Sequence, residues 1–91
     1  MDDKTKKILK DIINKANEKA EQYKRLKDRC NFLSLNLPLG ATYEIEQLKT
    51  KKIGVWGRYK ALEYCIMTIC ITYGIDKDDL RAEGLELLKI D

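Results

Sequence analysis

Residues 55–73 of the chain read VWGRYKALEYCIMTICITY, and apolar side chains recur in this stretch every three or four positions. The members of the repeat are Val55, Tyr59, Leu62, Ile66, Ile69 and Tyr73. This spacing sets apolar side chains along one side of an α-helix. We therefore expect a long helix that starts between Gly54 and Gly57 and ends near Tyr73, with Gly74 closing it.

An earlier segment of the chain carries the same repeat. Its members are Leu9, Ile13, Ala16, Ala20, Tyr23, Cys30 and Leu37. Asp2 or Asp3 can cap the start of this helix, with Thr5 as a competing cap, and Pro38 prevents continuation beyond about Leu37. Few globular helices are this long, so a break at the weak helix formers of residues 14–17 is an open alternative.

Two long apolar helices joined by a short turn fold back on each other as an antiparallel hairpin. Residues 42–50 read either as a short helix or as a strand. We favour a helix, because the chain offers no second strand for pairing. Asp76 is placed to cap a final helix from Lys77 to about Leu88. The sequence thus predicts one all-α domain over residues 1–91, a helical hairpin with short extra helices.

The stretch from Cys65 to Ile71 is apolar almost all the way around a helix, since Thr68 is its one polar residue. A two-helix hairpin cannot cover a helix that is apolar on several sides. Either the short flanking helices or other copies of the chain must bury it. We expect a helical homo-oligomer.

Composition excludes several classes of protein. The 91 residues carry a net charge of +3, with 44% hydrophobic and 36% charged residues, which is too apolar for a disordered chain. No apolar stretch is long enough to span a bilayer and the charged N-terminus lacks a secretory signal, so a cytoplasmic protein is expected. Its three cysteines form no CxxC pair and are expected to be reduced core thiols. Histidine is absent, which argues against an enzyme and against a metal site, and no cofactor is expected.

Residues 51–60, KKIGVWGRYK, combine basic and aromatic side chains near a helix start. Ammonium and guanidinium groups pair with phosphates, and aromatic faces stack on bases. Trp56, Arg58 and Lys60 are therefore candidate residues for binding an anionic nucleotide. The alternative is a solvated basic turn whose tryptophan belongs to the core. Nucleic-acid binding is less favoured, because the chain is only mildly basic.

Two polar residues, Lys27 and Ser34, occupy positions at which the first repeat predicts burial. A lysine held among apolar side chains needs an anionic partner. That partner is either Glu63 across the hairpin or a phosphate of a ligand. Glu63 in turn is expected to pair with Lys60 or Lys27. In an antiparallel hairpin, Lys27 can approach the start of the second helix, within one copy or between copies.

Residues 22–38, QYKRLKDRCNFLSLNLP, place a tyrosine four positions before a basic residue and end an apolar run at proline. Residues 60–67, KALEYCIM, are similar to a Lys–Leu–Glu–x–Ala–apolar–Met pattern, with one residue inserted after the lysine. Both segments resemble the phage helical hairpin proteins that sequester cyclic-nucleotide immune signals, the anti-CBASS and anti-Thoeris sponges.

This resemblance implies a non-enzymatic oligomer that binds a cyclic nucleotide between protomers and so counters host defence signalling. Tyr23, Lys27 and Lys60 are the residues that match the pattern. We accordingly expect a nucleotide-sequestering protein. The alternatives are a helical protein–protein interaction module, such as an inhibitor or adaptor, and a nucleic-acid-binding accessory protein.

Overall fold

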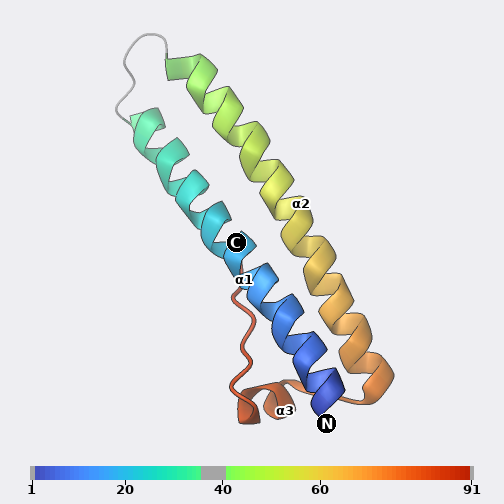
Figure 1. The fold of residues 1–91 in the computed structure, drawn as a ribbon. Helices are drawn as coiled ribbons and strands as arrows, with labels where there is room; N and C mark the ends of the chain where they lie inside the picture. Colours follow the sequence, from blue (N-terminus) through green and yellow to red (C-terminus); the bar gives the residue numbers. More distant parts are fainter. Residues whose placement is uncertain (1, 36–40, 91) are drawn as a thin grey trace.

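A computed structural model describes residues 2–35 and 41–90 of the chain. Within these ranges the chain forms helices α1 (Asp3–Leu35), α2 (Ala41–Tyr73) and α3 (Lys77–Ala82), and no strand. The two long helices lie antiparallel and side by side, and α3 lies near the start of α1, where Lys6 pairs with Glu83 just after α3 (Figure 1). The molecule is a rod of 56 × 19 × 16 Å. The predicted all-α hairpin is confirmed.

Helix α1 is continuous over 33 residues, so the chain does not break at residues 14–17. Its cap is Asp2, whose Oδ1 accepts a hydrogen bond from the Thr5 backbone N–H at 2.6 Å. This satisfies one of the free donors at the helix start and confirms the predicted aspartate cap. The predicted end of the helix at Leu37 lies outside the described residues.

Helix α2 begins at Ala41, which corrects the predicted start between Gly54 and Gly57. Residues 42–50 are helical, as favoured, but they form the first turns of α2 rather than a separate short helix. Ile45 is buried there against Leu33 of α1. Each glycine within a helix costs about 1 kcal/mol relative to alanine, and the burial of these first turns offsets that cost.

The last turn of α2 closes at Gly74, as predicted. Gly74 has φ of +66°, and the Ile75 N–H donates to the Cys70 carbonyl at 2.8 Å. This bond reaches back five residues, as in a Schellman motif. Glycine suits the position because it adopts the left-handed conformation without steric cost.

Helix α3 starts at the predicted cap, Asp76, but it ends at Ala82 instead of near Leu88. The side chains of Asp76 and Asp79 each accept a hydrogen bond from the other's backbone N–H, at 2.8 and 3.1 Å, which makes a capping box. Gly84, with φ of +71°, then turns the chain out of the helix. Directly after this turn, Leu85 is buried in the core of the hairpin.

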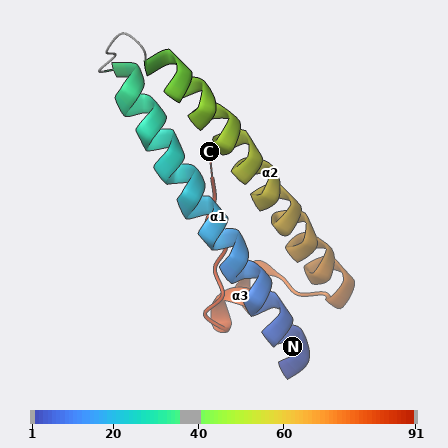
Figure 2. The same ribbon diagram turned by 45° about the horizontal axis from the view of Figure 1, so that its top comes forward.

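Residues 85–90, here called the strap, run back along α1 in irregular conformation (Figures 1 and 2). The side chain of Asn17 holds the strap backbone at two points. Its Nδ2 donates to the Glu86 carbonyl and its Oδ1 accepts from the Leu88 N–H, both at 2.8 Å. The Tyr59 hydroxyl of α2 donates to the Leu88 carbonyl. The strap is therefore fastened to both long helices.

The main core lies between α1, α2 and the strap. It consists of Leu9, Ile13, Ala16, Ala20, Tyr59, Ile66 and Leu85. Cys30 is buried as predicted, Tyr23 and Lys27 are half-buried, and Tyr73 is exposed. The prediction for Ser34 is wrong, because Ser34 is exposed and Leu33 is buried in its place. A seven-residue repeat drifts by about 20° per heptad around a straight helix. Near the end of α1, this drift moves the buried position from residue 34 to residue 33.

Candidate functional site

Among the described residues, no group of three or more His, Cys, Asp or Glu side chains lies close enough together to hold a metal ion. Cys30 is buried, and burial raises the pKa of the half-buried Cys70 thiol. Cys65 is exposed, so the prediction that all the thiols belong to the core is wrong for this residue. None of the described helices is long and apolar enough to cross a membrane.

Two of the predicted ligand residues, Tyr23 and Lys27, lie together in a groove between α1 and the strap, here called the strap groove. It has a volume of about 450 Å³. Its lining residues are Ala20, Glu21, Tyr23, Lys24, Lys27, Asp28, Leu88, Lys89 and Ile90. Lysines of both α1 and the strap thus line the groove together with one tyrosine.

Trp56 and Lys60, two further predicted ligand residues, contact each other on α2. The Lys60 Nζ lies 5.8 Å from the centre of the Trp56 ring and equally far from that of Tyr59. It also pairs with Glu63 Oε1 at 3.2 Å, which confirms Lys60 as the partner of Glu63. Within the described residues no ion pair joins Glu63 to Lys27.

The predicted five-residue site is therefore not one site within a single copy. Trp56, Arg58 and Lys60 do not line the strap groove. Arg58 is exposed, and two positions along a helix separate it from Lys60 by more than half a turn. The approach of Lys27 to this cluster across an interface between copies stays a prediction.

The basic residues between positions 49 and 60 also fail to form one face. They lie within α2, where successive residues turn by about 100°. Lys51 and Arg58 share one side, while Lys49 and Lys60 share another. Lys49 is paired with Glu46 at 3.7 Å. This distribution is unlike the single basic stripe that tracks a nucleic-acid backbone.

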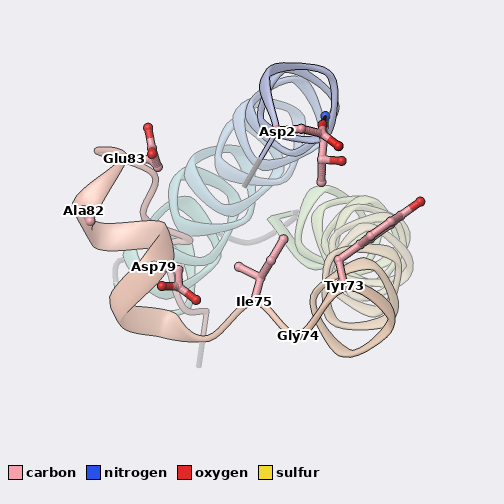
Figure 3. A pocket seen from close by; sticks show the side chains of 8 residues that line it. Asp2, Tyr73, Gly74, Ile75, Asp79, Ala82 and Glu83 are labelled. Atoms are coloured by element: carbon pink, nitrogen blue, oxygen red, sulfur yellow. Dashed lines mark hydrogen bonds between the residues drawn. The ribbon is translucent and has the colours of Figure 1, made fainter.

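A second hollow, of about 320 Å³, lies where the ends of α1 and α2 meet α3 (Figure 3). Ile75 points into it, between the two long helices (Figure 3). Its carboxylates have structural roles. The hydrogen bonds of Thr5 lower the pKa of the Asp2 cap, Asp79 belongs to the capping box, and the ion pair with Lys6 lowers the pKa of Glu83. Of these contacts, the ion pair between Lys6 and Glu83 joins the start of α1 to the end of α3.

The feature that the sequence analysis only partly found is a second apolar side of α2, here called the outer face. It consists of Ile53, Trp56, Lys60, Tyr64, Met67 and Ile71. The five apolar members are exposed by 67, 44, 72, 53 and 78%, respectively. The expectation of an over-apolar helix covered only Cys65–Ile71, whereas the exposed stripe extends back to Ile53. The sequence does carry a signal for this stripe, because its successive members are 3, 4, 4, 3 and 4 residues apart.

No family model matches the chain, and no curated protein or solved structure is significantly similar to it. The resemblance to the phage sponges therefore stays a prediction. Functional proposals for this chain depend on its own residues.

Proposed function

We propose that this chain is a non-enzymatic helical protein–protein interaction module that assembles with copies of itself. The observation that carries the proposal is the outer face of α2, which leaves five large apolar side chains exposed in one stripe. Monomeric proteins rarely expose a contiguous apolar patch of this kind. Tyrosine, tryptophan and methionine are also enriched at protein interfaces.

Light scattering on the purified chain at micromolar concentration tests this proposal. We expect a mass well above the 10.6 kDa of one copy. Met67→Glu puts a charge in the middle of the outer face and should shift the mass toward that of one copy. Thr72→Glu is the matched control, because Thr72 is exposed on another side of α2. A wild-type mass of 10.6 kDa would contradict the proposal.

A second candidate function is the binding of a small anionic nucleotide, and the strap groove favours it. Lys24, Lys27 and Lys89 line it together with Tyr23, and they outnumber the two acidic lining residues, Glu21 and Asp28. Ammonium groups can pair with phosphates while the ring stacks on a base. Together with the resemblance to phage sponges, this groove suggests sequestration of a cyclic-nucleotide signal.

Equilibrium dialysis against cyclic dinucleotides tests the second candidate. Wild type should bind one of them, and Lys27→Met should bind it at least tenfold more weakly. Lys10→Met is the control, because Lys10 is an exposed α1 residue outside the groove. Equal binding by all three chains, or no binding by wild type, would rule out a nucleotide site in the groove.

A further inference from the structure

The members of the outer face are arranged almost symmetrically about Leu62. Ile53 and Ile71 lie nine residues before and after it. Closer in, Trp56 lies six residues before and Met67 five residues after. Lys60 and Tyr64 lie two residues on either side. Two of the three resulting pairs, Ile53 with Ile71 and Trp56 with Met67, are therefore apolar in both members. The third pair joins Lys60 to Tyr64.

From this symmetry we infer that two copies pair through the outer face with their α2 helices antiparallel, level with each other at Leu62. The inference rests on the proposed self-assembly and adds its geometry. Such an interface is isologous, because the same surface serves both copies. Ile53 then lies against the partner's Ile71, and Trp56 against the partner's Met67. Lys60 lies against the partner's Tyr64.

The chemistry of each facing pair is favourable in this arrangement. The Ile53 and Ile71 side chains bury aliphatic surface, and a thioether against an indole ring is a favourable contact. The Lys60 ammonium already lies over two rings and beside Glu63. The partner's Tyr64 adds a further aromatic ring within reach of the same cation.

A parallel pairing of the same faces is unfavourable. It would set Lys60 directly against the partner's Lys60 in the middle of an apolar stripe. Like charges brought together at an interface disfavour that arrangement. The single cation of the outer face therefore selects the antiparallel orientation.

The size of the outer face is also appropriate for a second copy. Its five apolar side chains leave on the order of 500 Å² exposed per copy, at about 150–250 Å² for a whole aromatic side chain. A stable interface buries about 800 Å² per partner. The stripe supplies more than half of this area, and it extends over about 27 Å of helix, along which flanking side chains add the remainder.

Distances between spin labels test the orientation. Ala61→Cys and Gln47→Cys introduce exposed label sites on one side of α2, in a chain carrying Cys30→Ala, Cys65→Ser and Cys70→Ala. In the antiparallel pair, labels at position 61 lie close together, whereas labels at position 47 are separated by about 45 Å along the helix axis. Equal distances at the two positions would overturn the antiparallel pairing and leave self-assembly standing. A chain that stays at 10.6 kDa would contradict both.

Two substitutions in the chain with its native cysteines give an independent test by light scattering. Tyr64→Glu places a carboxylate against the partner's Lys60, so the dimer mass should persist. Met67→Glu places a carboxylate against the partner's Trp56, so the mass should fall to that of one copy. Equal loss of the dimer in both variants, or a dimer that survives Met67→Glu, would overturn the inferred pairing.

Discussion

Individual glycines illustrate how backbone conformation decides the effect of a side chain. Gly54 lies inside α2, and a Cβ built there meets no atom within 4 Å. Gly54→Ala should therefore raise the free energy of unfolding by about 1 kcal/mol, the difference in helix propensity. Gly74 has a positive φ, and Gly74→Ala should lower that free energy by about 1–2 kcal/mol. Urea denaturation measures both, and a loss of stability in Gly54→Ala would show that a Cβ there does meet a neighbour.

Lys27 is half-buried, and no ion pair joins it to a carboxylate within the described residues. Glu63 has Lys60 as its partner, so Lys27→Met strands no carboxylate. We expect this variant to unfold at the same temperature as wild type or higher, since a half-buried ammonium is removed. A loss on the order of 3 kcal/mol would instead mean that Lys27 supports a buried carboxylate.

Tyr59 connects the pH of the solution to the stability of the fold. Burial, helped by the nearby Glu63 carboxylate, raises the pKa of the Tyr59 hydroxyl from 10.0 to about 12. The folded state thus holds this proton more tightly than the unfolded state. The contribution of this difference in pKa to the free energy of unfolding is complete below pH 10 and is lost as the pH rises to about 12.

Urea denaturation between pH 8 and pH 11.5 should therefore show that the wild-type chain loses stability as the pH rises, and that Tyr59→Phe loses less. The control variant also removes the hydrogen bond to the Leu88 carbonyl, so its stability should start lower at pH 8. Identical slopes for the two chains above pH 10 would mean that the hydroxyl does not titrate differently on folding.

At the scale of an element, the strap depends on one side chain of α1. Asn17 supplies a donor and an acceptor to the strap backbone, as a neighbouring strand would. Asn17→Ala should lower the free energy of unfolding by about 1–3 kcal/mol, because two hydrogen bonds are lost. The Leu88 amide should exchange with solvent faster. Asn14→Ala, at an exposed position of the same helix, is the control: it should raise the free energy of unfolding by about 0.5 kcal/mol through helix propensity and leave the exchange of the Leu88 amide unchanged.

Helix α2 as an element has two apolar sides, which is why it is less amphipathic than α1. One side, with Tyr59 and Ile66, is buried against α1 and the strap. The other is the outer face, whose five large apolar side chains are left largely exposed by the part of the chain that the structure describes. A helix that is apolar on two sides is typical of the interior of a larger bundle. Two hairpins paired through α2 would form such a bundle.

At the scale of the whole molecule, self-assembly should make thermal stability depend on concentration. Association of folded copies stabilises the native state by mass action. The melting temperature of wild type should therefore rise between 1 and 100 µM, whereas that of Met67→Glu should stay constant. A wild-type melting temperature that is independent of concentration would contradict assembly through the outer face.

The parts of the fold that follow from the sequence are those governed by neighbours in the chain. The caps at Asp2 and Asp76 and the end of α2 at Gly74 depend on groups within about five residues. The buried side of α1 follows from its repeat. These interactions are short in sequence and can be derived without knowing the fold, as can the i,i+3 pairing of Lys60 with Glu63.

Only the tertiary structure decided the features that join distant segments. Local propensity stops α2 at its glycines, but burial of Ile45 on Leu33 carries the helix past them. The strap lies on Asn17 and Tyr59 across 71 and 29 residues of sequence, and no local pattern encodes that contact. Which apolar side of α2 is covered likewise depends on where α1 and the strap pack, because a period of 3.6 residues shows that two sides are apolar and not which one becomes the core.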